Sequence, residues 1–363
     1  MELDNLFRES LKKYSPYEPE EQIDEDGWLK LNINQNAYPP IPEIVEEVKD
    51  AIGDGSILRE YPDSLALEVR KAILNQLLRD KDTLTNRNSI FISNGSDEIF
   101  DTIFKVFINP GDEIVIFYPT YGIYKVLANL YDAKINEIKL SDDFSIPESV
   151  FSVQGKLLLI SSPNNPNGKS FGNFIISKIC KNFSGIIVVD EAYADFSDNT
   201  CLPLLKTFNN LIVCRTFSQT FSVASMRIGY ALADPNIIKE MNRVKLPYNT
   251  SALAQITALA CIKHRNKIFK QNEEIVTERV RLTAELKKFN GIDVLPSDAN
   301  FIFIKFDDKS TTLKFLWDLK EMKILVRHFS QPGLYNYLRM TIGSEDQNDK
   351  FLSAFQKIAK KYL

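Results

Sequence analysis

The chain contains few histidines and cysteines, and neither residue type is arranged for metal or redox chemistry. Only His264 and His328 occur in 363 residues, too few for a histidine-rich metal site. A serine–histidine hydrolase would need one of them, and no G-x-S-x-G nucleophile turn is present. The cysteines are scattered without a C-x-x-C pair, which predicts reduced, mostly packed thiols in a cytoplasmic protein. They are Cys180, Cys201, Cys214 and Cys261.

Long apolar runs and an excess of one charge are also missing. No apolar run approaches about 18 residues, and the first residues, MELDNLFRESLKK, are charged, so neither a membrane span nor a secretory leader is predicted. The net charge is −4 with both signs mixed along the chain, which argues against a nucleic-acid surface. Hydrophobic residues make up 44% of the chain, enough for a large buried core.

Short apolar strands alternate with helical patterns in the middle of the chain, which predicts an α/β fold with a mainly parallel sheet. The expected strands are Ile90–Ser93, Glu113–Phe117, Lys156–Ser161, Ile186–Asp190, Leu211–Arg215 and Ile228–Ala233. A long helical region follows from Pro235 to about Phe289, and a smaller α+β unit begins after Gly291. That unit has expected strands at Phe301–Phe306, Ile324–Phe329 and Tyr337–Ile342, and helices near Thr311–Met322 and Asp346–Tyr362. We therefore expect a large domain at residues 45–245, and a small domain formed by residues 1–44 and 246–363.

Polar residues follow several predicted strands, at the sheet edge where open α/β folds bind ligands. The segment Asn94–Glu98, NGSDE, links a strand to a helix, so it could bind phosphate through the first-turn amides or simply cap the helix. Asp190 ends an apolar strand and could cap a helix or hold a proton on a pyridine nitrogen. Tyr121 and Tyr193 lie just past two strand ends, where they could contact a planar ring or pack in the core.

One motif resembles a nucleotide-binding loop but lacks its chemistry. Gly168-Lys169-Ser170 matches the end of a P-loop, and the strand before Asp190 resembles a Walker B strand. Pro163 stands where the first P-loop glycine is needed, and proline has no N–H for a phosphate. The sequence therefore argues against ATP hydrolysis.

Taken together, the motifs resemble a fold-type-I pyridoxal 5'-phosphate enzyme, in particular the histidinol-phosphate aminotransferase group. The resemblance covers almost the whole chain. Its motifs are NINQNAYPP (32–40), EYPD (60–63), NGSDE (94–98), PTYGIY (119–124), SPNNPNG (162–168), DEAY (190–193), RTFSQTFSVASMRIGY (215–230), PSDANF (296–301) and YLRMTIG (337–343). The family usually has N-E-N-P at positions 34–37, where this chain has Asn-Gln-Asn-Ala, so the substrate stays open.

The resemblance implies a role for individual residues. The cofactor phosphate would bind to Gly95, Ser96, Asp97, Thr216, Ser218 and Arg227, with Tyr61 reaching it from the other subunit of a homodimer. Tyr121 would cover the cofactor ring, Asn165 and Tyr193 would hold its hydroxyl, and Asp190 would pair with its nitrogen. Arg339 would hold the acidic end of substrates, and Arg327, Tyr17 and Asn36 would add substrate contacts. No metal is implied.

Gln219 departs from the resemblance, because the family carries a lysine there. That lysine forms a Schiff base with the cofactor and moves the reacting proton. A glutamine amide does neither near neutral pH, so the resemblance implies a largely inactive chain that holds the cofactor non-covalently or as an external aldimine. Two explanations are open: a deliberate change that traps a bound substrate aldimine, or a natural change that leaves a binding protein or an enzyme with altered chemistry.

The implied reaction is an amino transfer between a phosphate-bearing small molecule and 2-oxoglutarate or glutamate. Histidinol phosphate and imidazole-acetol phosphate are the first candidates. Serinol phosphate with dihydroxyacetone phosphate, decarboxylation of an O-phospho amino acid, and a non-catalytic cofactor-binding protein are the alternatives.

Overall fold

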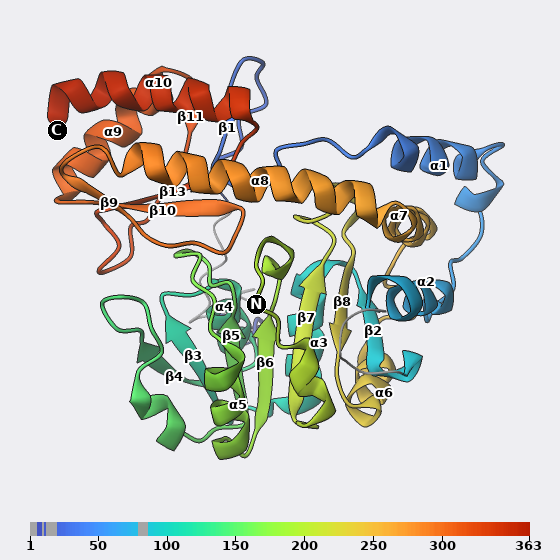
Figure 1. Ribbon diagram of the computed structural model, residues 1–363. Coiled ribbons are helices and arrows are strands. Elements are labelled where there is room, and N and C mark those ends of the chain that lie inside the picture. Colours follow the sequence, from blue (N-terminus) through green and yellow to red (C-terminus); the bar gives the residue numbers. More distant parts are fainter. Residues whose placement is uncertain (1–5, 9–10, 12–19, 79–85) are drawn as a thin grey trace.

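A seven-stranded mixed sheet forms the centre of the computed structural model, which describes residues 6–8, 11, 20–78 and 86–363 (Figure 1). Its order is β2-β8-β7-β6-β5-β3-β4. The strands are β2 (Ile90–Ser93), β3 (Glu113–Tyr118), β4 (Lys134–Lys139), β5 (Leu157–Ser161), β6 (Ile186–Asp190), β7 (Leu211–Thr216) and β8 (Gly229–Leu232). The sheet is mainly parallel, as predicted, and β8 runs antiparallel to both of its neighbours. Strand β4 was not predicted, because its sequence KINEIK lacks the apolar run of the central strands. The strand lies at the edge of the sheet, where it is partly exposed.

Helices cover both faces of this sheet because successive strand side chains point in opposite directions. On β5, Leu157 and Leu159 join one core cluster, whereas Leu158 and Ile160 join another. The first cluster is completed by α3 (Gly95–Phe107), α4 (Ile123–Leu130) and α6 (Pro235–Val244). The second includes residues of α2 (Leu67–Ala72), α5 (Asn173–Asn182) and α7 (Ala252–Lys263).

A smaller antiparallel sheet lies beyond the carboxyl ends of the large sheet's parallel strands. Its order is β12-β13-β10-β9, and it is packed with the last two helices. These elements are β9 (Ile292–Val294), β10 (Phe301–Phe306), β12 (Arg327–His328), β13 (Tyr337–Thr341), α9 (Lys309–Glu321) and α10 (Glu345–Tyr362). The prediction of one strand at Ile324–Phe329 is wrong, because the chain changes partners at Val326. There β11 (Ile324–Leu325) pairs with β1 (Leu29–Lys30), whereas β12 pairs with β13.

Two further segments join the large sheet to the small one. The 22-residue helix α8 (Arg265–Leu286) extends along the molecule above the large sheet (Figure 1). The N-terminal segment lies against the small sheet, since the N–H of Leu31 donates to Leu325 and its carbonyl accepts from Thr341. It continues into α1 (Pro42–Ile52), which packs on α7. Among the described helices, none is long and apolar enough to cross a membrane.

Replacing Phe100 with alanine tests the packing of α3. Phe100 is fully buried, and its ring lies edge-on to Tyr124 at a centroid distance of 5.1 Å. We expect Phe100→Ala to lower the free energy of unfolding by about 3–5 kcal/mol, because the lost ring leaves a cavity. Urea denaturation measures the change. The matched control is Phe174→Ala at an exposed position of α5, expected to stay within about 0.5 kcal/mol. Equal losses in the two variants would contradict the packing.

Candidate functional site

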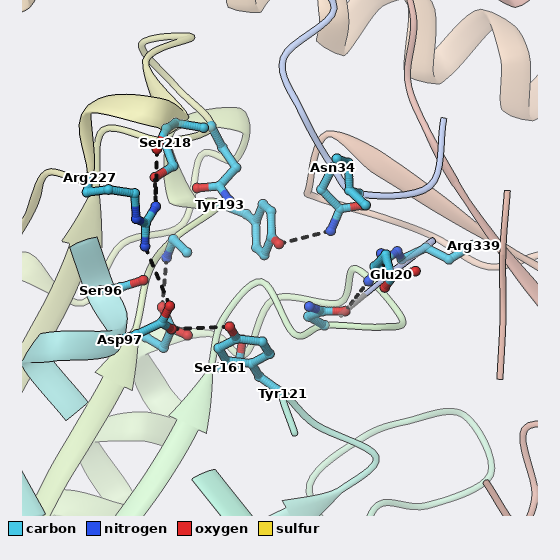
Figure 2. A pocket seen from close by; sticks show the side chains of 16 residues that line it. Glu20, Asn34, Ser96, Asp97, Tyr121, Ser161, Tyr193, Ser218, Arg227 and Arg339 are labelled. Atoms are coloured by element: carbon cyan, nitrogen blue, oxygen red, sulfur yellow. Dashed lines mark hydrogen bonds and ion pairs between the residues drawn. The ribbon is translucent and has the colours of Figure 1, made fainter. Parts of the chain in front are cut away.

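A cavity of about 210 Å³ lies at the carboxyl ends of the parallel strands, where the large sheet meets the small one (Figure 2). Strand ends contribute Ser161 and Asp190, and the loop after β7 contributes Ser218 and Gln219. The lining residues from the N-terminal segment and the small sheet are Glu20, Ile33, Asn34 and Arg339. Thus three parts of the chain that are distant in sequence enclose one space.

Ser96, Asp97, Ser218 and Arg227 line one end of this cavity. Together with the neighbouring Gly95 we call them the anion cup. The guanidinium of Arg227 lies 3.4 Å from the Ser218 hydroxyl and 3.5 Å from the Asp97 carboxylate. Gly95 has a φ of +78°, and a Cβ there would lie 2.4 Å from Nη2 of Arg227. The glycine therefore lets the guanidinium approach the start of α3, where backbone N–H groups and the helix dipole also attract anions.

Two neighbours place the anion cup. The hydroxyl of Thr216 bonds to Ser218 at 3.0 Å and does not line the cavity. A Cβ on Gly229 would lie 2.7 Å from the carbonyl carbon of Gly95, so a glycine is needed where β8 passes the start of α3. Of the predicted phosphate contacts, Gly95, Ser96, Asp97, Ser218 and Arg227 come together, whereas Thr216 supports them from behind.

Asp190 is a buried carboxylate beside the cavity. Its Oδ2 accepts a 2.6 Å hydrogen bond from the Tyr124 hydroxyl, and its Oδ1 accepts one from the N–H of Ala192. Burial raises the pKa of Asp190 to about 6, although these two hydrogen bonds act to lower it. Among the described residues, no arginine or lysine forms an ion pair with it. Such a carboxylate suits a cationic N–H on a ligand. The sequence analysis did not identify Tyr124 as a site residue. It lies three residues after Tyr121, in the first turn of α4.

Two tyrosines form side walls of the cavity. The Tyr121 hydroxyl donates to Oδ1 of Asp97 at 3.1 Å, so the ring is fixed beside the anion cup. The Tyr193 hydroxyl accepts a 2.9 Å hydrogen bond from Nδ2 of Asn34, and both contacts are drawn in Figure 2. Asn34 was missed as a site residue. The sequence feature that could have indicated it is the NINQN motif, in which Asn34 itself adopts a φ of +57°.

Gln219 lines the cavity, and its backbone is held by other parts of the chain. Its carbonyl accepts a 2.8 Å hydrogen bond from Nδ2 of Asn36, which also donates to Oδ1 of Asn272 on α8. Its side-chain Oε1 is buried and has no hydrogen-bond donor among the described residues. Asn36 is not among the residues lining the cavity, so the structure places it behind Gln219 instead of at the predicted substrate contact.

Arg339 lines the other end of the cavity, and Arg327 lines an adjoining cavity that Arg339 shares; we call these two residues the arginine pair. They are direct cross-strand partners of β12 and β13, which places their side chains on the same face of the small sheet. Arg339 is only 4% exposed and donates to Oδ1 of Asn165 at 2.6 Å and to the carbonyl of Asn32 at 2.7 Å. Asn165, which was predicted to contact the cofactor ring, therefore also contacts one member of the arginine pair.

Of the two remaining predicted residues, Tyr61 does not line this cavity. Tyr61 is 80% exposed and stacks on Tyr248 with ring centroids 4.4 Å apart. Tyr17 lies outside the described residues. Within the described part of the chain, no cluster of three or more His, Cys, Asp or Glu side chains could hold a metal ion.

Comparisons with known proteins agree with this architecture. Residues 26–355 match the aminotransferase class I and II family. A histidinol-phosphate aminotransferase of Citrifermentans bemidjiense is 35% identical over 356 residues, covering 97% of this chain and 98% of that protein. The corresponding protein of Microcystis aeruginosa is 34% identical over 353 residues, with the same coverage of both chains. A solved histidinol-phosphate aminotransferase from Sinorhizobium meliloti, in complex with pyridoxal 5'-phosphate, has a TM-score of 0.83 at 20% identity and covers 92% of this chain and 91% of that one. The predicted fold type is confirmed.

The pKa of Asp190 predicts how stability changes with pH. The folded chain keeps this proton up to about pH 6, whereas an ordinary aspartate loses it near 3.8. Ionised Asp190 therefore costs stability, increasingly from about pH 4 to 6 and constantly above. We expect ligand-free Asp190→Asn to be more stable than the native chain above pH 6, by on the order of 2–3 kcal/mol. The difference should vanish near pH 4.

Urea unfolding over this pH range measures the difference. Asp293→Asn, at an exposed position of β9, controls for the general effect of removing one negative charge. A difference between Asp190→Asn and the native chain that does not change with pH would contradict the assignment of the raised pKa.

Proposed function

Because the chain belongs to the class I and II aminotransferase family, we propose that it binds pyridoxal 5'-phosphate and a phosphate-bearing amine in the cavity at the sheet edge. One observation carries the proposal: a buried carboxylate without a cationic partner, Asp190, lies between an anion cup and an arginine pair. A ligand with a cationic ring nitrogen and a phosphate would complement the first two of these features. An anionic substrate end would complement the third.

The lining residues fit this cofactor group by group. Its phosphate would accept hydrogen bonds from Ser96, Ser218 and Arg227 in the anion cup. Asp190 would hold the proton on the ring nitrogen, and Tyr124 would keep the carboxylate oriented through its 2.6 Å hydrogen bond. Tyr121 would cover the ring. When bound, pyridoxal 5'-phosphate supplies an electron sink for the carbon that loses a proton.

Asn165 and Tyr193 would face the ring hydroxyl. Each of them also contacts another part of the site, since Asn165 accepts from Arg339 and Tyr193 accepts from Asn34. These contacts would orient the amide and the phenol, so that binding at the ring and binding at the arginine pair act on one connected set of hydrogen bonds.

We further propose histidinol phosphate as the amine and 2-oxoglutarate as its acceptor. The support is the family of relatives at about 35% identity over nearly the full chain together with the arginine pair. A guanidinium binds phosphate and carboxylate through paired N–H donors, and Arg339 is held by Asn165 and Asn32 in a fixed orientation. Arg339 would bind the anionic end common to both substrates, with Arg327 beside it.

Gln219 stands, in this proposal, at the position of the lysine that bonds the cofactor. Its side chain lines the cavity, and a lysine amine there would face the same space. An amide nitrogen neither attacks an aldehyde nor accepts a proton near neutral pH, so the chain would bind the cofactor without a covalent bond. Loss of a general base typically costs about 10²–10⁴-fold in rate, and we expect little turnover.

We also propose a homodimer in which Tyr61 reaches the partner's anion cup. The support is that Tyr61 and Tyr248 stack on the surface, away from this chain's own cavity, with the exposed side chains of Leu58 and Leu246 also available for contact.

We also propose that residues 45–245 form the large domain. The separate small-sheet core and the long helix α8 between the sheets support it.

Restoring the lysine tests the proposed reaction. We expect Gln219→Lys with pyridoxal 5'-phosphate to transfer the amino group of histidinol phosphate to 2-oxoglutarate at least about 10²-fold faster than the native chain. Glutamate formation measures the rate, and borohydride reduction followed by mass spectrometry measures covalent cofactor. Gln219→Met, which has a similar length and no amine, is the matched control.

Serinol phosphate is tested in parallel as the amino donor. A faster reaction with it would replace histidinol phosphate as the proposed substrate. Covalent cofactor in Gln219→Lys without transfer from either donor would argue against an aminotransferase of phosphorylated amines.

Mixing two subunit variants, each with a defect in cofactor binding, tests the position of Tyr61. If Tyr61 acts across a dimer, combining Tyr61→Ala with Arg227→Ala subunits places both defects in one site and leaves the other site intact. Random exchange should then restore tight cofactor binding at about a quarter of all sites. Fluorescence titration with pyridoxal 5'-phosphate measures this fraction. If no tight sites appear although subunits exchange, Tyr61 does not act across the dimer.

A further inference from the structure

Glu20 bridges the arginine pair in the unliganded chain. One carboxylate oxygen lies 3.0 Å from Nη1 of Arg327 and the other lies 3.2 Å from Nη2 of Arg339. The Glu20 side chain is only 13% exposed, so this contact is part of the cavity wall and not a surface ion pair. Figure 2 shows Glu20 beside Arg339, at the end of the cavity away from Arg227. A residue of the N-terminal segment thus occupies the place of an anion.

Arg339 does not depend on Glu20 alone for its position. Arg327 and Arg339 face each other across the β12–β13 ladder, and Arg339 is also held by Asn165 and the carbonyl of Asn32. Two like charges opposite each other in a sheet repel. They therefore favour any anion that can lie between them, whether it belongs to the chain or to a ligand.

The bridge uses only part of what the two guanidinium groups offer. The contacts to Glu20 run from Nη1 of Arg327 and Nη2 of Arg339, whereas a guanidinium can present two parallel donors to one anion. The Nε atoms of both Arg327 and Arg339 are buried and have no acceptor among the described residues. Burial raises the pKa of Glu20 despite the lowering effect of both arginines, so the ion pairs do not fully offset the loss of hydration.

Glu20 also lies where two cavities meet. A second cavity of about 210 Å³ shares Glu20, Tyr121, Asn165 and Arg339 with the first one and extends to Arg327. Movement of the Glu20 carboxylate would therefore join the two spaces beside the arginine pair. The combined space would give a ligand access to both guanidinium groups.

We propose that Glu20 is a tethered anion that occupies the arginine pair and that a phosphate monoester or dicarboxylate ligand must displace it. This inference rests on the proposed function and deepens it, because it concerns how the same site admits its anionic substrates. A tethered group competes at an effective concentration that reaches the millimolar range for short flexible links. Glu20 would thus weaken the binding of every ligand that needs both arginines and leave uncharged ligand ends unaffected.

Glu20→Gln tests the proposal by removing the charge while keeping the size of the side chain. Calorimetric titration of the full chain, saturated with pyridoxal 5'-phosphate, gives dissociation constants for L-histidinol phosphate, 2-oxoglutarate and L-histidinol. We expect Glu20→Gln to bind both anions about tenfold more tightly, because the internal charge-assisted contacts no longer compete. The affinity for L-histidinol, which lacks the phosphate, should not change.

Glu21→Gln is the matched control. Glu21 is the next residue and pairs with Lys320 at 2.7 Å instead of with the arginine pair. Its substitution removes the same charge from the same segment, and all three affinities should stay at the native values. Glu20→Asp provides a second variant that retains the charge but cannot bridge both arginines as readily, and its anion affinities should fall between those of the native chain and Glu20→Gln.

Three outcomes overturn the proposal. Weaker anion binding in Glu20→Gln would mean that Glu20 helps to bind the ligand. Unchanged binding would mean that Glu20 does not compete with it. An equal gain in affinity in Glu21→Gln would mean that the effect comes only from removing one negative charge. The proposed function fails separately. If histidinol phosphate binds to no variant, the substrate assignment is wrong, whereas 2-oxoglutarate still reports on Glu20. The latter titration is repeated without cofactor if pyridoxal 5'-phosphate does not bind.

Discussion

The rest of the site is arranged around the buried carboxylate of Asp190, which ends β6 without a cation beside it. Its neighbour Glu191 points to the other side and is also buried, but it accepts hydrogen bonds from Nε and Nη2 of Arg215 at 3.0 and 2.7 Å. Thr200 donates to the same carboxylate. The two adjacent acids thus have different environments. Glu191 is neutralised by Arg215, whereas Asp190 has only a hydroxyl and an amide as its partners.

This contrast supports the proposal that Asp190 keeps its charge for a ligand, whereas the charge of Glu191 is structural. A buried acid that serves only stability is expected to have a basic partner, as Glu191 has. Asp190 instead retains an unfavourable environment that a cationic ligand would relieve. The arginine pair shows the same condition with the opposite sign, since its guanidinium groups have donors without acceptors and only a partial internal anion. Asp190 and the arginine pair would therefore both be stabilised by a ligand group of opposite charge.

Local patterns in the sequence predict the central strands and name most of the residues that line the candidate cavity. Continuous apolar runs identify β5, β6 and β7, and ligand residues in such folds follow the strands directly. The direction of β8 and the change of partner at Val326 are not visible in that pattern, since they depend on which strand lies alongside. Asn34 and Glu20 were missed for a related reason. Their partners, Tyr193 and the arginine pair, are 159 and more than 300 residues away, and no local motif encodes such a contact.

The hydrogen bond from Asn36 to the backbone carbonyl of Gln219 has a wider consequence. The loop is held by its main chain, and Asn272 on α8 in turn holds Asn36. The side chain at position 219 is therefore not what keeps the loop in place. Under the proposed function, the reactive group could therefore be lost or regained by a change in one codon while the surrounding pocket persists. The fold of the loop around position 219 therefore does not depend on which side chain that position carries.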